Sequence, residues 1–172
     1  MAPAAQTLST VLAWGTLLTQ VVILLLALLM VQERRSSTPS ALLTFIRERA
    51  LTLSFLIALA ASALTLVYSE IFKFVPCGLC WFQRIFLYPQ VLLLLVAFLK
   101  RDRGVTDYLI TLSIPGLLFS LYHHMVQIAG HGVLPCPTSG GDCGQRLIFE
   151  FSYITFPLMA STVFALLIVL SL

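Results

Sequence analysis

The sequence predicts an all-α membrane protein, folded as one compact bundle of spanning helices. Hydrophobic residues make up 59% of its 172 residues and charged residues only 10%, and the mean hydropathy is +1.00. A soluble domain carries about 25% charged residues, so this chain has too little polar surface to cover a water-soluble globule. The net charge of +3 comes without a long basic run. We therefore expect a lipid bilayer, and not nucleic acid, as the partner.

Five stretches are long and apolar enough to approach the roughly 20 residues that a spanning helix needs. The stretches are Leu8–Val31, Ala50–Tyr68, Trp81–Leu99, Tyr108–Ile128 and Phe149–Leu172. The first could instead be a signal peptide, but residues 1–20 contain no Lys or Arg, and no small-residue cleavage site follows the apolar run. A retained helix fits these features better.

The basic residues predict the topology, because cytoplasmic connections are enriched in Lys and Arg. Two connections hold seven of the ten basic residues, namely Arg34, Arg35, Arg47, Arg49, Lys100, Arg101 and Arg103. This places segments 32–49 and 100–107 in the cytoplasm, together with the C-terminus. The N-terminus and segments 69–80 and 129–148 then face outward.

All four cysteines fall in the outward connections or at a helix start there: Cys77, Cys80, Cys136 and Cys143. The outer side of the membrane is where disulfides persist. Proximity in sequence favours the pairs 77–80 and 136–143 at rest, whereas a relay of disulfide exchange would also visit other pairings.

The Cys77-Gly78-Leu79-Cys80 segment is better suited to redox chemistry than to stapling the fold. A disulfide stabilises more when it closes a longer loop, and this one would close only four residues. A short exposed CxxC is typical of a redox pair with a thiolate at a helix N-terminus. Cys80 is expected in the first turn of the third span, where the helix dipole favours a negative sulfur.

For Cys136 and Cys143 alone, a redox role and a structural staple both remain open. A zinc site built from all four thiolates is the third alternative. It fits poorly, because 55 residues separate the C-x2-C pair from the C-x6-C pair.

Three further side chains are candidates for binding an electron acceptor. Arg84 follows Cys80 by four residues, which places both on one helix face about 6 Å apart along the axis. Arg84 either extends to the membrane surface or supplies a fixed positive charge that favours a thiolate and polarises an acceptor carbonyl. His123 and His124 lie near the outer end of the fourth span and point to different faces. Either is a packing residue or a hydrogen-bond and proton partner of a quinone oxygen.

The stretch from Cys77 to Pro89, CGLCWFQRIFLYP, closely resembles the disulfide bond formation protein B (DsbB) family in its BdbC-like branch. That family has a CxxC at the head of a membrane helix, an Arg four residues later, and then Tyr-Pro. The segment Tyr122–Gln127 and the loop holding Cys136 and Cys143 match further family features. The resemblance covers residues 50–172.

This resemblance implies a four-helix transmembrane bundle over residues 50–172. Residues 1–49 then form an extra N-terminal transmembrane helix and a cytoplasmic loop, a departure whose role the residues do not decide. The implied activity is oxidation of a DsbA-like, thioredoxin-fold thiol oxidase, with a membrane quinone, ubiquinone or menaquinone, as acceptor. The implied location is the bacterial cytoplasmic membrane.

The resemblance also implies a role for each cysteine. Cys136 forms the mixed disulfide with the partner protein, and Cys143 is its resolving mate. Electrons then pass to the Cys77–Cys80 disulfide, whose Cys80 lies beside the quinone. The loop between Cys136 and Cys143 is short for the family, which makes the exchange between the two pairs the step most in question.

The resemblance further implies that Arg84 polarises the quinone ring and that His123, or less closely His124, is the quinone-site histidine. Two rival functions remain. A thiol enzyme of the vitamin K epoxide reductase type shares the helical bundle and a CxxC, so net electron direction is the discriminator, and the resemblance around Arg84 argues against it. A non-enzymatic membrane subunit would use the cysteines as staples or to hold a metal.

Overall fold

The structure is a computed structural model that describes residues 3–36, 40–130, 136 and 140–172. Its α-helices are α1 (Pro3–Ser36), α2 (Ala41–Leu66), α3 (Gly78–Lys100), α4 (Thr106–Ala129) and α5 (Phe156–Ser171). A π-helical turn, η1 (Val67–Ile71), continues α2, and a short 3-10 turn, η2 (Arg103–Val105), precedes α4. The described residues contain no β-strand, only two isolated bridges.

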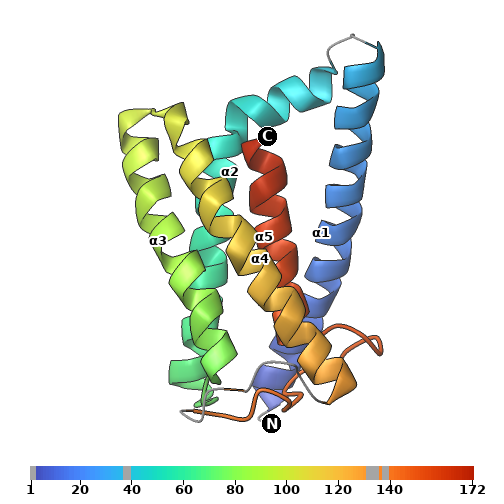
Figure 1. Cartoon of the computed structure of the whole chain (residues 1–172), viewed down its shortest axis with the longest axis vertical. Helices are drawn as coiled ribbons and strands as arrows, with labels where there is room; N and C mark the ends of the chain where they lie inside the picture. Colours follow the sequence, from blue (N-terminus) through green and yellow to red (C-terminus); the bar gives the residue numbers. More distant parts are fainter. Residues whose placement is uncertain (1–2, 37–39, 131–135, 137–139) are drawn as a thin grey trace.

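The helices run side by side, and the connections gather at two ends of the bundle (Figure 1). The N-terminus, the start of α3 and the segment between α4 and α5 lie at one end, which we call the cysteine end. The α1–α2 and α3–α4 connections and the C-terminus lie at the other. The basic residues Arg34 and Arg35, in the last turn of α1, and Lys100, in the last turn of α3, are therefore far from the cysteine end.

Four helices, α1 to α4, are long and apolar enough to cross a membrane, with η1 extending the second to Ile71. With the short apolar helix α5, they confirm the predicted all-α membrane protein. The predicted fifth span, Phe149–Leu172, was too long: α5 has 16 residues, or about 24 Å of helix. Phe151 and Ser152 have positive φ angles of 50° and 64°, which a continuous helix does not allow.

The start of α5 is set by Thr155 and Pro157. The Thr155 side chain caps the helix by accepting a hydrogen bond from the backbone N–H of Leu158 at 3.4 Å. Pro157 lies in the first turn, where the missing N–H of proline costs nothing. Before this cap, Glu150 and Ile154 exchange two backbone hydrogen bonds that close a tight turn.

The predicted connection 32–49 is also shorter than expected, because α1 continues to Ser36 and α2 begins at Ala41. Arg47 forms an ion pair with Glu33 at 3.0 Å, which links the two helices beyond their apolar runs. The charges that suggested a loop thus lie on helices. The boundary predicted at residues 49/50 falls inside α2.

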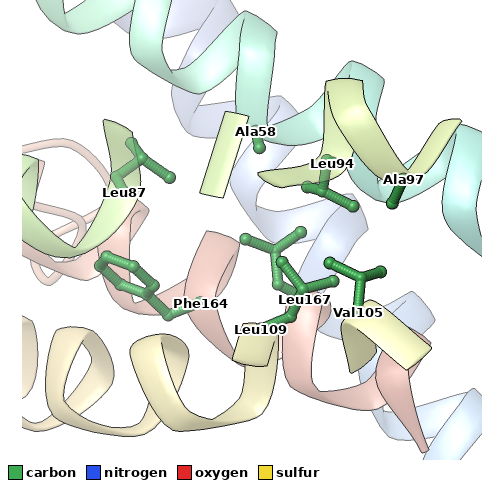
Figure 2. Close-up of a cluster of buried hydrophobic side chains, with 8 residues drawn as sticks. All are labelled: Ala58, Leu87, Leu94, Ala97, Val105, Leu109, Phe164 and Leu167. Carbon is green, nitrogen blue, oxygen red and sulfur yellow. The ribbon is translucent and has the colours of Figure 1, made fainter. Parts of the chain in front are cut away.

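The main hydrophobic core lies between α2, α3, α4 and α5 (Figure 2). Phe164 and Leu167 of α5 pack there against Leu94 of α3 and Leu109 of α4. Gly116 of α4 lets Phe164 approach closely, since a Cβ at this glycine would lie 2.5 Å from the ring. Among the described residues, this cluster has no member from α1, so the other four helices form a bundle of their own.

Helix α1 packs chiefly against α5, on the outside of that bundle. Its contacts include several hydrogen bonds between side chains. Ser9 bonds the hydroxyl of Tyr68 at 2.9 Å, and Gln20 donates to Thr162 at 3.2 Å. Hydrogen bonds between membrane helices are worth about 0.6–2 kcal/mol each, so these contacts fix the position of α1.

Candidate functional site: two cysteine pairs beside an apolar cavity

The CxxC segment begins α3, as the sequence predicts. Cys77 is the N-cap residue, with extended backbone angles, and its sulfur accepts a hydrogen bond from the backbone N–H of Cys80 at 3.3 Å. The two cysteines are free thiols whose sulfurs lie 2.7 Å apart. The hydrogen-bonding N–H of the helix terminus is therefore directed at Cys77 rather than at Cys80, where the sequence placed the favoured thiolate.

These contacts lower the pKa of the Cys77 thiol well below its ordinary value of 9.0. The hydrogen bond from the Cys80 thiol is the largest cause. Burial acts in the opposite direction, while His123 and the backbone N–H of Cys80 lower the pKa further. In the reduced pair, Cys77 is thus the residue that holds the negative charge.

The second pair, Cys136 and Cys143, forms a disulfide. Buried Cys143 belongs to one cluster with Cys77, Leu79 and Val126, and both Cys80 and Cys136 pack against this cluster. Residues 137–139 of the intervening loop lie outside the described part of the chain. The structure nevertheless brings the two cysteine pairs together despite the short loop between Cys136 and Cys143.

Two glycines allow this close approach. Gly140 has a φ of +111°, and a Cβ there would lie 2.5 Å from the carbonyl oxygen of Pro76. A Cβ at Gly141 would lie 2.7 Å from the carbonyl oxygen of Val75. The backbone of Gly141 also donates to Pro76 at 3.5 Å. Residues 140–141 thus lie directly against the turn that presents Cys77.

His123 connects the two pairs. It is only 1% exposed. Its Nδ1 accepts from the side-chain amide of Gln83 at 3.0 Å, so its Nε2 carries the proton in this arrangement. Nε2 donates to the carbonyl oxygen of Cys143 at 3.1 Å and lies 3.6 Å from the sulfur of Cys77. The Nε2–H of His123 therefore lies between the two cysteine pairs.

His124, the other candidate histidine, lies elsewhere. Its Nδ1 pairs at 2.8 Å with the hydroxyl of Thr155, the residue that caps α5. It is not among the residues that line the cavity described below, whereas His123 is. These contacts are those of a packing residue, through which α4 contacts the start of α5.

Arg84 is buried beside the CxxC segment, with only 9% of its surface exposed. It donates to the carbonyl oxygen of Thr65 at 2.8 Å, and its guanidinium lies 5.2 Å from the ring centre of Trp81. Among the residues that the structure describes, no carboxylate forms an ion pair with it. A buried guanidinium without a counter-charge is costly in a membrane, and it favours a ligand with an exposed carbonyl oxygen.

Such a ligand has room in a cavity of about 380 Å³ that opens beside these residues. Its walls come from all five α-helices, and α2, α5 and α1 contribute mainly apolar side chains and hydroxyls. A volume of this size is within the usual range of about 300–1,000 Å³ for small-molecule sites. Hydrogen bonds join four residues of its lining, Cys77, Cys80, Gln83 and His123, and with Arg84, one turn after Cys80, they form what we call the polar end of the cavity. The polar residues Gln127, Asp142 and Gln145 also line it.

Two supporting residues were not singled out in the sequence. Gln83 holds His123, and Thr65 supplies the carbonyl oxygen that binds Arg84. Gln83 could have been found, because it follows Cys80 by three residues and so shares its helix face. Thr65 acts through its backbone, which leaves no signal in the sequence.

Comparison with known families identifies the family to which this chain belongs. The model of the family described as disulfide bond formation protein DsbB matches residues 47–172. The chain belongs to the DsbB family. This confirms the predicted resemblance, and with the apolar helices it makes the chain a multi-pass membrane thiol oxidoreductase. The match includes all four cysteines but leaves out all of α1, its connection to α2 and the first residues of α2.

Relatives of this family cover most of the chain. The disulfide bond formation protein C of Bacillus subtilis is 41% identical over 118 residues, which are 67% of this chain and 85% of that protein. The SPbeta prophage-derived disulfide bond formation protein B of the same organism is 38% identical over 115 residues, 67% of this chain and 78% of that protein. A probable disulfide formation protein C of Halalkalibacterium halodurans is 39% identical over 120 residues, 69% and 88% of the two chains. No solved structure matches the chain.

Proposed function

We propose that this family member reoxidises an extracytoplasmic, DsbA-like thioredoxin-fold thiol oxidase and passes the electrons to a membrane quinone. One observation carries the proposal: a disulfide and a pair of free thiols share one buried cluster at the polar end of an apolar cavity. The first pair suits exchange with a protein, and the second suits exchange with a small acceptor in the membrane. The proposed location is the bacterial cytoplasmic membrane, with the cysteine end facing outward.

The first step takes place at Cys136 and Cys143. A thiolate of the partner attacks the sulfur of Cys136, which is half-buried and therefore easier to reach than fully buried Cys143. A mixed disulfide forms, and Cys143 leaves as a thiolate. The second thiol of the partner then displaces Cys136, so the partner is oxidised by two electrons and this pair is reduced.

The second step moves those two electrons to the other pair. The reduced Cys136–Cys143 pair attacks a Cys77–Cys80 disulfide, and Cys77 leaves as a thiolate, which Cys80 and His123 stabilise by hydrogen bonds. Cys80 is then displaced in turn as the Cys136–Cys143 disulfide forms again, which leaves the state seen in the structure, with that disulfide and free thiols at Cys77 and Cys80.

The reduced Cys77–Cys80 pair must then lose two electrons and two protons for the next cycle. A bound quinone supplies a two-electron, two-proton acceptor. Arg84 would hold and polarise its carbonyl oxygen, and the apolar walls would enclose its ring and exclude water. Ubiquinone and menaquinone share these features, so both are candidate acceptors.

The test is quinone reduction by the detergent-purified protein, with a reduced thioredoxin-fold dithiol as donor. Wild-type protein should turn over, and Cys80→Ala should not. Arg84→Met should raise the KM for quinone by about 10- to 100-fold, since a hydrogen bond to a charged group is worth about 1.5–3 kcal/mol. No turnover by the wild type with either quinone class, across several donors, would refute the proposal.

A second candidate is a metal site, because Cys77, Cys80 and His123 offer ligand atoms that all lie within 4.8 Å of one another. Two thiolates and an imidazole are suitable ligands for zinc. Elemental analysis of the purified protein separates the two functions. Zinc at one equivalent that is lost in Cys77→Ser would favour the metal site, while metal-free protein that reduces quinone would exclude it.

A further inference from the structure

Helix α1 forms one wall of the cavity, although all of it lies outside the matched family region. Its cavity residues are Leu12, Gly15, Thr16 and Thr19. Their spacing places them on one face of the helix, over about 10 Å of its length. Since α1 begins at Pro3 at the cysteine end (Figure 1), this wall starts about 13 Å along the helix from that end and runs toward the middle of the bundle.

The α1 wall differs chemically from the polar end of the cavity. Thr16 donates its hydroxyl proton to the carbonyl oxygen of Leu12 at 2.8 Å, and Thr19 donates to Gly15 at 2.7 Å. Both hydroxyl protons are therefore used within the helix. The wall offers methyl groups, a leucine and a glycine, whereas the lining from α3 offers the guanidinium of Arg84, the amide of Gln83 and the thiol of Cys80.

On this wall, the packing of neighbouring groups does not explain why residue 15 is a glycine. A glycine within a helix costs about 1 kcal/mol relative to alanine. A Cβ added at Gly15 would have no atom within 4 Å, so no neighbouring group requires the small residue. Gly15 is exposed, lines the cavity and leaves open space where a side chain would lie.

We propose that α1 forms the subsite for the isoprenoid tail of the quinone, with Gly15 as the notch that leaves room for it. The inference rests on the proposed quinone function. The ring, which carries the carbonyl oxygens, belongs at Arg84, and the hydrocarbon tail belongs along the apolar wall of Leu12, Gly15, Thr16 and Thr19. In this arrangement α1 determines how well tailed quinones bind, without touching the reacting sulfurs.

The experiment compares two naphthoquinones with closely similar rings: menadione, which has no tail, and menaquinone, which has an isoprenoid tail. The variants are Gly15→Ala, Gly15→Phe and, as a matched control, Val21→Phe. Val21 is 53% exposed on the same helix and does not line the cavity. Steady-state KM and kcat are measured for both quinones, along with the amount of menaquinone that each purified variant retains.

In Gly15→Phe, the KM for menaquinone should rise at least about tenfold, as for a filled hydrophobic pocket, and less menaquinone should be retained. The values for menadione and the kcat should stay near wild type. Gly15→Ala should show a smaller change of the same kind, and Val21→Phe none. An unchanged KM and an unchanged retained amount in Gly15→Phe would overturn the inference. So would an equal loss for menadione, which would place the ring, not the tail, at α1.

Failure of the underlying function gives a different result. If wild-type protein reduces neither quinone and retains none, the quinone function itself is refuted. If wild type reduces both and Gly15→Phe behaves like wild type, only the role of α1 is refuted.

Discussion

At the scale of single residues, the site depends on the different surroundings of the two CxxC sulfurs. Cys77 accepts the backbone N–H of Cys80 and contacts His123. Cys80 lies one turn before Arg84 and lines the same cavity. One sulfur is therefore set up to carry negative charge and to leave in disulfide exchange, and the other lies next to the group that would bind an acceptor.

The lowered pKa of Cys77 predicts a distinct pH profile for alkylation of the reduced protein. Because the thiolate is the reactive form and the pKa is lowered, Cys77 should keep its reactivity as the pH falls from 8 to 6. A thiol with the ordinary pKa of 9.0 would lose about tenfold in rate per pH unit there. Iodoacetamide labelling with peptide mass spectrometry measures the rate at this residue.

The variant His123→Phe is the control for this measurement. It removes one of the interactions that lower the pKa of Cys77, so the profile should move to higher pH. A wild-type rate that already falls tenfold per unit below pH 8 would contradict the assignment of the charge to Cys77.

The adjacent histidines predict a second contrast. His123→Gln should slow quinone reduction at least about tenfold, because a lost hydrogen bond to a charged group is worth about 1.5–3 kcal/mol. His124→Gln should keep wild-type turnover and lower only the melting temperature, since its partner is the cap of α5. Turnover and thermal unfolding of both variants check this, and equal losses of turnover would show that His124 also serves the site.

At the scale of structural elements, the approach of the second cysteine loop to the start of α3 depends on Gly140. Gly140→Ala should disrupt the packing of this loop, because the residue has positive φ and its Cβ would meet the carbonyl oxygen of Pro76. Strain of this kind costs about 1–3 kcal/mol. The rate of exchange between the two pairs, followed by trapping the thiols with maleimide after rapid mixing with a reduced donor, should fall.

Gly144→Ala is the matched control in the same loop. Its Cβ would lie 3.6 Å from a carboxylate oxygen of Asp142, an ordinary contact. We expect exchange at the wild-type rate in this variant. If Gly140→Ala also exchanged at that rate, close backbone packing would not be what brings the pairs together.

The helices also show which structural features could be predicted from the sequence. Apolar length predicted that four of the helices exist, because the bilayer imposes that length, and it gave the bounds of α3 and α4 to within three residues. Helices α1 and α2 extend further, since charged residues continue them past their apolar runs. The segment 149–155 was wrongly joined to the last helix, since Phe149, Phe151 and Tyr153 look apolar. Two features keep this segment out of α5. One is a tight turn with positive φ angles, and the other is a contact between Phe151 and Trp14 of α1, with 4.8 Å between ring centres. Hydropathy contains neither feature.

At the scale of the whole molecule, sequence motifs predicted which residues belong to the site. They did not predict that the two cysteine pairs lie in contact. The 55 residues between Cys80 and Cys136 carry no information on distance, and the short second loop suggested poor reach. The structure brings the pairs together through backbone packing. The position of α1 at the cavity was likewise beyond the sequence, because its residues there are small and without an obvious pattern.

The arrangement of charge predicts the orientation of the whole molecule. Basic residues gather at the end opposite the cysteines, in the last turns of α1 and α3, and such residues favour the cytoplasm. A fluorescent protein fused to the C-terminus should therefore fluoresce, and alkaline phosphatase fused there should be inactive. Alkaline phosphatase fused after residue 72, near the cysteine end, should be active, and the reverse pattern would invert the proposed topology.

The pairing of α1 with α5 has a consequence for biosynthesis. Membrane helices leave the ribosome in order, so the first helix enters the bilayer while its main packing partner, the last helix, has not yet been made. Until then Gln20 lacks both Thr162 and Tyr153, its later hydrogen-bond partners. The cavity can form only once α5 has been inserted, because α5 supplies part of its lining. A chain that stops before α5 therefore has all four cysteines but lacks the complete cavity beside them.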